Sequence, residues 1–429
     1  MNGSVPSLLS PENWPFSLEF LPQRAYMVGG AVRDAILERT REYLDLDFVL
    51  SSDAVQVARK IATHYTAGFV LLDPQREIAR VVFPDATVDF AQQEGDRLET
   101  DLHRRDFTVN AIAYNPHTQE IIDPLQGYVD LQQRVLRMIS PANLEDDPLR
   151  LMRAYRQAAQ LGFTIELDTQ TAIRSLASHI IKVAPERVRT ELSYMLANAQ
   201  GTPWIVKAWE DGLLVPFFKD ATKESVILLP VLDKAASQLG EIWQQLGVEL
   251  AQYIRDTVKT TWLGIAKLAC LVNPEPETAE TQLTQLTYSR AEIKAVTTAL
   301  RLLPQFKEPV MSLREQYFFF QEAGFVFPAI AVLAVAYGTS AQVISDSDLL
   351  RIYAPFITRY LNPDDLVAHP TPLVSGRDIM LALNIPASPL VGKLLTEIAV
   401  AQIESKVSTA EQAIEFAARL LVDNPTADK

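Results

Sequence analysis

Two short stretches near the N-terminus carry residues whose types and spacing suit phosphate and metal chemistry. The first is a Gly-Gly turn, Gly29 and Gly30, with Arg33 three residues later. Such a turn lets backbone N–H groups approach a phosphate without interference from a Cβ atom, and the following helix N-terminus adds partial positive charge. Arg33 can add a full charge. The combination predicts a phosphate-binding turn, although alone it fits a plain strand, turn and helix equally well.

The second stretch is Leu44–Leu50, in which apolar residues alternate with Asp45 and Asp47. A period of two predicts a strand with one apolar and one acidic face, so both carboxylates point the same way. Such a pair can hold Mg²⁺, which prefers a few carboxylates together with phosphates and water. Solvated aspartates on a plain strand are the alternative. With one cysteine, Cys270, and five scattered histidines, the chain offers no Cys/His cluster, so any metal must be held by oxygen.

A further candidate lies within residues 104–113. Arg105 can neutralise part of a triphosphate, while Asp106 and Asn110 can hold a ribose or orient the arginine. A capped helix start with a solvated arginine pair is the alternative for this stretch alone.

The last candidate begins at Asp147, just ahead of an expected helix. Arg150, Arg153 and Arg156 follow at intervals of three, which places them near one helix face. A solvated basic stripe is the usual meaning of such spacing, so this candidate gains weight only in combination with the others.

The elements that must position these residues change in character along the chain. The first 140 residues indicate an α/β region, and apolar residues at helical spacing dominate from Pro148 onward. The expected strands are Ala25–Val28, Leu44–Leu50, Phe69–Leu72, Ala79–Phe83 and Thr87–Phe90. The expected helices are Val32–Leu37, Ala54–Thr63, Pro148–Leu161, Thr169–His179 and Pro185–Asn198, with mostly helical patterns beyond Ile205.

Composition and charge limit the classes of protein that remain. With 429 residues, 48% of them hydrophobic and 21% charged, the chain is long enough for about three globular domains. A net charge of −14 argues against wholesale electrostatic binding of nucleic acid, but Arg134–Arg189 holds nine basic against six acidic residues. The longest uncharged apolar run, Ala323–Gly338, is too short to cross a bilayer, and the first twenty residues show no secretory signal. A cytoplasmic protein without a membrane partner is expected.

Together the motifs resemble those of the class II tRNA nucleotidyltransferases and bacterial poly(A) polymerases, the CCA-adding group of the polymerase-β-like superfamily. The resemblance is close over Met27–Leu196 and weaker afterwards. It implies that metals and triphosphate are held by Gly29, Gly30, Arg33, Asp45 and Asp47, and that phosphate and ribose are bound by Arg105, Asp106 and Asn110. It also implies that the incoming base is read by Asp147 and Arg150, followed by Arg153 and Arg156. The neck helices would be braced by Glu186, Arg187 and Glu191.

The resemblance extends to Asp89, in a strand where the superfamily often places a third carboxylate, which implies a catalytic role for this residue. The sequence departs from the family pattern at Asp146, usually a glutamate, and at Gln126, usually a glycine. The segment Ala91–Leu102 is short and lacks the loop typical of enzymes that add a complete CCA end. In those enzymes a mobile loop contacts the head during the switch from C to A, so the short segment favours a restricted product, CC or A.

The fold class implied is α+β, a polymerase-β-like nucleotidyltransferase head followed by an all-helical neck, body and tail. The expected segments are residues 1–140 for the head, 141–200 for the neck, 201–365 for the body and 366–429 for a tRNA-binding tail. The implied reaction is attack of the tRNA 3′-hydroxyl on the α-phosphate of CTP or ATP, with release of pyrophosphate and two Mg²⁺ ions as cofactors. Arg33 and Arg105 are expected to contact the triphosphate.

Three alternatives remain open at this stage. A poly(A) polymerase of the same superfamily would extend RNA generally. A non-catalytic RNA-binding protein of the same fold would be expected to have lost the pair Asp45 and Asp47, which is intact here. A nucleotide-binding regulator would not need the long helical region after position 200.

Overall fold

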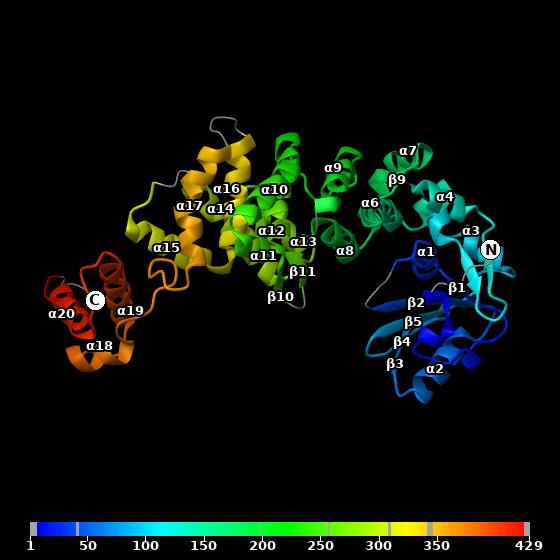
Figure 1. Cartoon of the computed structure of the whole chain (residues 1–429), viewed down its shortest axis with the longest axis horizontal. Helices are drawn as coiled ribbons and strands as arrows, with labels where there is room; N and C mark the ends of the chain where they lie inside the picture. Colours follow the sequence, from blue (N-terminus) through cyan, green and yellow to red (C-terminus); the bar gives the residue numbers. More distant parts are fainter. Residues whose placement is uncertain are drawn as a thin grey trace. The chain divides into compact units, whose positions relative to one another are not determined.

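The computed structural model describes residues 7–39, 43–197, 199–255, 258–307, 310–340 and 346–423. The chain divides into two compact units (Figure 1). Unit 1 comprises Met1–Glu191 together with Lys207–Pro216, and unit 2 comprises Leu192–Val206 together with Phe217–Lys429. The chain therefore passes from unit 1 to unit 2, returns for ten residues and leaves again. The finer division into head, neck, body and tail stays a prediction.

Unit 1 is built on a seven-stranded sheet with the order β3-β4-β5-β2-β1-β6-β7. The strands are β1 (Ala25–Val28), β2 (Leu44–Leu50), β3 (Gly68–Asp73), β4 (Ile78–Val82), β5 (Ala86–Gln92), β6 (Ala113–Asn115) and β7 (Glu120–Ile122). Strands β2 and β5 run parallel, and the other neighbours pair antiparallel. Helix α2 (Ala54–His64) packs against β4 and β5 and connects β2 to the edge hairpin (Figure 1).

The alternation in β2 produces its two faces as expected. Leu46 and Phe48 are buried, and the Phe48 ring stacks on Phe90 of β5 with centroids 5.6 Å apart. The opposite face carries Asp45 and Asp47, which lie in register with Thr87 and Asp89 of β5. The sheet therefore anchors the acidic face through an aromatic core on its other side.

The rest of unit 1 is mainly helical. Its helices are α1 (Gly30–Ile36), α3 (Leu98–His103), α4 (Gly127–Gln133), α5 (Pro141–Asp146), α6 (Leu149–Leu161), α7 (Leu167–Leu176) and the first half of α8 (Pro185–Leu196). Short 3₁₀ helices lie at Ser7–Leu9, Pro11–Asn13, Leu18–Phe20, Thr108–Asn110 and Ala177–Lys182. Two-residue strands β8 (Val135–Leu136) and β9 (Thr164–Ile165) pair in parallel.

Unit 2 is a helical assembly with one added hairpin, β10 (Tyr253–Arg255) and β11 (Val258–Thr261). Its helices are α9 (Thr202–Glu210, shared with unit 1), α10 (Lys223–Ile242), α11 (Gln244–Ala251), α12 (Trp262–Leu271), α13 (Pro276–Gln285), α14 (Arg290–Lys307), α15 (Leu313–Ala323), α16 (Phe327–Ser340), α17 (Asp346–Leu361), α18 (Gly376–Leu383), α19 (Pro389–Ile403) and α20 (Ala410–Asp423), with 3₁₀ turns at Ala199–Gly201 and Gly324–Val326. The α+β class is confirmed, and the hairpin is a local addition that the sequence analysis did not anticipate.

Helix α16 forms the centre of unit 2 and contacts α10, α12, α14 and α17. The helical run Leu313–Ser340 has the length and apolar composition of a membrane span, but 67% of its most apolar window is buried among the other helices. Burial of this kind is typical of the core helix of a helical domain. Its apolar character is thus accounted for by packing.

Candidate active site

The glycine turn, one carboxylate and one arginine converge at the end of β1. Gly29 has a φ of 75°, a conformation that glycine adopts at little cost. A Cβ atom at Gly29 would lie 3.2 Å from Asp47 Oδ2 and 3.6 Å from Arg105 Nη1. Any larger residue would be strained and would crowd both groups. The structure therefore brings together the glycine turn, Asp47 on the acidic face of β2, and Arg105.

The two carboxylates of β2 lie in different environments. Asp45 is exposed, and its Oδ1 accepts a hydrogen bond of 2.8 Å from Thr87 Oγ1. Burial raises the pKa of Asp47 to about 6, and the negative charges of Asp45 and Asp89 add to this effect, while Arg105 and Arg153 oppose it. A bound cation would relieve this electrostatic cost. The donor set therefore fits a hard divalent metal ion.

Asp89 is in register with Asp47, but its carboxylate is already engaged. Arg80 of β4 donates to both of its oxygens, Nε to Oδ1 at 2.7 Å and Nη2 to Oδ2 at 2.8 Å. Among the described residues, no group of three or more Asp, Glu, His or Cys side chains is arranged to hold a metal. Asp45 and Asp47 are therefore the two carboxylates that stay predicted metal ligands, with Asp89 paired to Arg80 beside them.

Arg33 lies inside the protein, with 7% of its surface exposed. Its Nε donates to Asp34 Oδ1 at 2.9 Å, and its Nη1 donates to Asn110 Oδ1 at 2.7 Å. The guanidinium is thus directed at protein acceptors. In this geometry Arg33 fixes Asn110, and its expected contact with a triphosphate stays a prediction.

Asn110 and Asp106 continue the same network. Asn110 Nδ2 donates to Asp106 Oδ1 at 2.8 Å and to Gln157 Oε1 of α6 at 2.9 Å. Burial would raise the pKa of Asp106, but the nearby Arg153 charge and the hydrogen bonds from Asn110 and the Phe107 N–H outweigh it, so the pKa lies below its ordinary value. The carboxylate is therefore ionised and held rigidly between the motif and α6.

Arg105, the arginine of the 104–113 stretch, has an N–H donor that no described residue accepts. Its Nη2 lies 3.2 Å from Asp101 Oδ2, and about a quarter of its side chain is exposed. Its Nε is buried and has no hydrogen-bond partner among the described residues. An unsatisfied buried donor is costly, and an anion at this position would satisfy it. Arg105 is therefore the better placed of the two arginines to receive phosphate.

Asp147 and Arg150 lie at the junction between α5 and α6. Asp147 Oδ1 accepts the Leu149 N–H at 3.3 Å, and Oδ2 accepts from Arg187 Nη2 at 3.2 Å. Arg150 Nη1 donates to the Asn143 carbonyl oxygen at 2.8 Å. Both side chains are partly exposed and held by neighbours, as a pair that presents hydrogen-bonding groups to a ligand must be.

Most of the remaining predicted residues form ion pairs with other site residues, and one of them lies on the surface. Arg153 Nε pairs with Asp106 Oδ2 at 3.0 Å, and Arg156 Nε pairs with the buried Glu191 of α8. Arg187 contacts Asp147, while Glu186 is exposed. The structure therefore joins Glu191 to Arg156 of α6 and Arg187 to Asp147, and it leaves Glu186 on the surface.

Sequence reasoning missed several residues that form hydrogen bonds with the predicted site residues and so fix their positions. These are Arg80, Thr87, Asp101, Asn143 and Gln157, each bonded to a predicted site residue or to its backbone. Thr87 could have been found, because it lies two residues before Asp89 and the two expected strands are parallel neighbours. Arg80 and Gln157 come from elements whose pairing the sequence pattern does not specify.

Family models match three parts of the chain. Residues 25–137 match a model described as the poly A polymerase head domain, residues 162–224 one described as a probable RNA and SrmB-binding site of polymerase A, and residues 257–418 one described as tRNA nucleotidyltransferase domain 2. The first covers the sheet, the glycine turn and the Arg105 motif. The third covers most of unit 2, where the sequence motifs were weakest.

Full-length relatives place the chain in a family. It is 47% identical over 408 residues to a CC-adding tRNA nucleotidyltransferase of Synechocystis sp., with 95% of this chain and 96% of the relative covered. It is 30% identical to an A-adding tRNA nucleotidyltransferase of Deinococcus radiodurans, with 94% and 97% covered. A solved CCA-adding enzyme with ATP has the same fold, with a TM-score of 0.68, 21% identity, and 92% and 91% covered.

The chain belongs to the tRNA nucleotidyltransferase family. It is a nucleotidyltransferase that adds C, A or both to the 3′ end of tRNA, with tRNA and CTP or ATP as partners. The predicted family, fold class, enzyme class and partners are confirmed. Enzymes of this kind generally use divalent metal ions, and the relatives are bacterial proteins.

Proposed function

We propose that this enzyme adds two C residues to the tRNA 3′ end and leaves the terminal A to another enzyme. The observation that carries this proposal is the 47% identity, over almost the full length of both chains, to a relative named as CC-adding. The A-adding relative, which is covered to a similar extent, is 30% identical.

The connection after β5 supports a restricted product. β5 ends at Gln92 and α3 begins at Leu98, so five residues join them. Within this connection, the Glu94 N–H donates to Asp101 Oδ1 at 3.2 Å, and the Glu94 carboxylate pairs with Arg104. A short connection held at Glu94 has little reach, whereas a change from C to A requires the base-reading residues to be repositioned.

The catalytic roles follow the geometry of unit 1. Asp45 and Asp47 would hold Mg²⁺, which when bound lowers the pKa of the attacking hydroxyl and stabilises charge on the leaving oxygens. The Gly29 turn leaves room beside Asp47 for the triphosphate, and Arg105 Nε offers a donor to it. Asp89 acts as a neutralised neighbour, since Arg80 occupies both of its oxygens.

The hydrogen-bond and ion-pair network around Asn110 positions Asp106. Arg33 orients Asn110, and Asn110 with Arg153 holds Asp106 in place for a ribose contact. These groups are pre-oriented before substrate arrives, which lowers the entropic cost of binding.

The base-reading role belongs to Asp147 and Arg150. Asp147 offers acceptor oxygens and Arg150 offers N–H donors, and this pairing matches the donor and acceptor groups on the Watson–Crick edge of cytosine. Arg187 and the Asn143 carbonyl hold the pair in its present geometry, which would keep it set for one base. We further propose that the reaction takes place in the bacterial cytoplasm.

The deciding experiment uses three tRNAs that end at the discriminator base, at C or at CC, each incubated with CTP, ATP or both. We expect C residues from CTP to be added to the first two substrates, with growth stopping at CC, and no A residue from ATP to be added to any of them. Product sequencing reads the result, and the Asp47→Ala variant is the inactive control. Conversion of the shortest tRNA to a CCA end would refute CC specificity, as would addition of A alone, while long A tracts on arbitrary RNA would indicate a poly(A) polymerase.

A further inference from the structure

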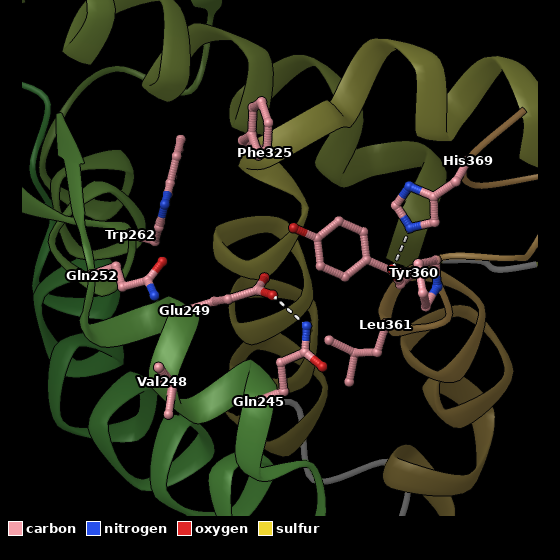
Figure 2. A pocket seen from close by; sticks show the side chains of 10 residues that line it. Gln245, Val248, Glu249, Gln252, Trp262, Phe325, Tyr360, Leu361 and His369 are labelled. Atoms are coloured by element: carbon pink, nitrogen blue, oxygen red, sulfur yellow. Dashed lines mark hydrogen bonds between the residues drawn. The ribbon is translucent and has the colours of Figure 1, made fainter.

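A pocket of about 460 Å³ lies within unit 2 and is lined by residues that belong to none of the motifs discussed so far. Figure 2 shows the side chains around it. Six of these ten side chains come from α11 (Gln245 and Glu249), the start of α12 (Trp262), the 3₁₀ turn Gly324–Val326 (Phe325), the end of α17 (Tyr360) and the loop that follows (His369). Four of these six side chains are aromatic rings.

The aromatic rings have more exposed surface than core packing requires. Phe325 is 82% exposed, and it is presented by Gly324, whose φ of 45° turns the chain between α15 and α16. Trp262 is partly exposed at the first position of α12. Tyr360 has one ring face stacked on the buried Phe327, with centroids 4.4 Å apart. An apolar ring left in water is costly, so the exposed Phe325 points to a flat partner that covers it.

The polar side of the pocket is a carboxylate held in position. Gln245 Nε2 donates to Glu249 Oε1 at 3.1 Å, as the dashed line in Figure 2 shows. Burial raises the pKa of Tyr360 above its ordinary value, and the negative charge of Glu249 adds to this, so the phenol beside the carboxylate stays protonated. A carboxylate has about four acceptor positions, so Glu249 keeps acceptor capacity for a ligand.

A basic and aromatic hairpin adjoins the pocket. The backbone N–H of Trp262 donates to the backbone carbonyl oxygen of Gln252 at 3.2 Å, which closes the base of the hairpin β10–β11 at the pocket wall. The hairpin carries the exposed side chains of Tyr253, Arg255 and Lys259. Basic residues interleaved with exposed aromatic rings are typical of surfaces that bind single-stranded nucleic acid.

We propose that this pocket binds one unpaired guanine base of the tRNA, with the base stacked on Phe325 and Trp262 and its Watson–Crick edge bonded to Glu249. Arg255 and Lys259 would contact the adjoining phosphates. Aromatic stacking of a base that is splayed out of a helix is a common mode of RNA recognition. The proposal rests on the tRNA substrate of the family and is independent of which nucleotides the enzyme adds.

Guanine is selected by the chemistry of Glu249. Its Watson–Crick edge presents two adjacent donors, N1–H and N2–H, which match the two oxygens of one carboxylate. Adenine and cytosine each present an acceptor beside their amino donor, and uracil flanks its single donor with two carbonyl oxygens. Each of the other bases would therefore set an acceptor against the Glu249 carboxylate and be rejected.

The test is chemical footprinting with kethoxal, which reacts with N1 and N2 of unpaired guanine. The full-length enzyme is bound to a tRNA that lacks its 3′ CCA end, and reactivity is read at each guanine. We expect one unpaired guanine to react at least about tenfold more slowly in the complex. Glu249→Gln and Phe325→Ala should each restore its reactivity and weaken tRNA binding about tenfold, the size of losing one stacked base.

Matched controls come from the same unit. Glu241→Gln changes an exposed glutamate at the end of α10, and Phe318→Ala removes a partly exposed ring on α15; neither side chain lines the pocket. Both controls should keep the footprint and the affinity of the wild type. Because Phe325 is 82% exposed, its removal should leave the thermal midpoint unchanged, so loss of the footprint cannot be attributed to unfolding.

A second measurement tests the edge contact directly. Inosine lacks the N2 amino group, so placing it at the protected position should weaken binding to the wild type and change nothing for Glu249→Gln. Persistence of the footprint in both pocket variants, or an equal effect of inosine on wild type and Glu249→Gln, would overturn the proposal. Nucleotide addition to the same tRNA by the wild type, measured in parallel, reports on the enzyme function separately.

Discussion

The two units use buried charge in opposite ways. Among the described residues, the buried charged side chains of unit 1 are Arg33, Asp34, Asp101, Asp106, Asp130, Glu191 and Asp211, whereas those of unit 2 are Lys267 and Glu292. Most of the unit 1 group belongs to the motifs or braces them. Unit 2 instead fills its centre with the apolar helix α16. Unit 1 thus accepts the cost of burying charge in order to fix reactive groups, and unit 2 is stabilised by apolar packing.

The largest effect should come from Asp47→Asn, which separates activity from stability. We expect nucleotide addition to fall by about 10³-fold or more, since the carboxylate that we propose to hold Mg²⁺ is lost. Stability without metal should rise by roughly 1–3 kcal/mol, because the folded state raises the pKa of Asp47 to about 6 and so disfavours its charge at neutral pH. Denaturant titration at pH 7.5 with EDTA measures the gain.

The matched control for Asp47→Asn is Asp85→Asn, which changes an exposed aspartate in the turn between β4 and β5. It should alter neither activity nor stability. The pH dependence follows from the sign of the shift: between about pH 4 and 6 the folded state binds more protons at Asp47, so wild-type stability falls as pH rises through this window. A variant that loses stability in EDTA would contradict the assignment of Asp47 as a strained metal ligand.

A large effect on stability alone is expected at the buried ion pair of unit 2. Lys267 of α12 has a fully buried side chain, and its Nζ lies 2.7 Å from Asp233 Oδ1 of α10. Lys267→Met leaves that mostly buried carboxylate without its cation and should cost roughly 2–4 kcal/mol. The double variant Lys267→Met, Asp233→Leu should recover most of the loss, because two apolar residues replace the pair. Both variants should keep kcat for nucleotide addition, measured below the melting transition.

The corresponding pair in unit 1 sharpens the contrast. Replacing Asp106 by Leu and Arg153 by Met also exchanges an ion pair for apolar residues, here one between a buried carboxylate and a partly exposed guanidinium, but it removes the group that Asn110 holds. We expect activity to be lost even where stability is kept. Equal retention of activity in the two double variants would show that buried charge serves packing in both units.

Asp211 tests whether the returning segment Lys207–Pro216 belongs to unit 1. Its carboxylate accepts hydrogen bonds from Tyr155 at 2.6 Å, Arg174 at 2.7 Å and Gln170 at 3.0 Å. Burial would raise the pKa of Asp211, but these bonds outweigh it and hold the pKa below its ordinary value. The stability it contributes is therefore present above the unfolded pKa of about 4 and is lost as pH falls through the lower folded value.

We expect Asp211→Asn to lower the free energy of unfolding at pH 7 by roughly 1–3 kcal/mol. We also expect the free energy of unfolding of the variant to fall less steeply than that of the wild type as the pH is lowered below about 4. The control is Glu210→Gln, which changes the neighbouring exposed residue. A fall as steep as that of the wild type would mean that the segment is held by other contacts.

The sequence analysis succeeded where chemistry and periodicity agreed. The alternation of Leu44–Leu50 predicted the two faces of β2, and the structure places Asp45 and Asp47 on one of them. It could not predict the ion pair between Arg80 and Asp89, because that pair depends on β4 lying beside β5. The same limit applies to Arg33, whose partners Asp34 and Asn110 are set by packing of α1.

In unit 2 the sequence signal was weaker, and only part of the structure could be predicted. The hairpin β10–β11 was missed although Tyr253–Thr261 is rich in β-branched and aromatic residues, a signal of strands. The pocket beside it gathers residues more than 100 positions apart, from Gln245 to His369, so no local pattern could have revealed it. Helical packing alone brings those side chains together.

The smallest expected effect is at the surface of unit 2, where Arg314 of α15 donates to both oxygens of Glu397 on α19, at 2.6 and 2.8 Å. Both side chains are more than one third exposed, so solvent and salt screen the pair. Arg314→Gln should therefore cost no more than about 0.5–1 kcal/mol, and the cost should shrink in 1 M salt. Denaturant titration at two salt concentrations measures it, with the reciprocal Glu397→Gln as the matched control. A loss as large as that of Lys267→Met would show that unit 2 also depends on charge, because an exposed pair would then match a buried one.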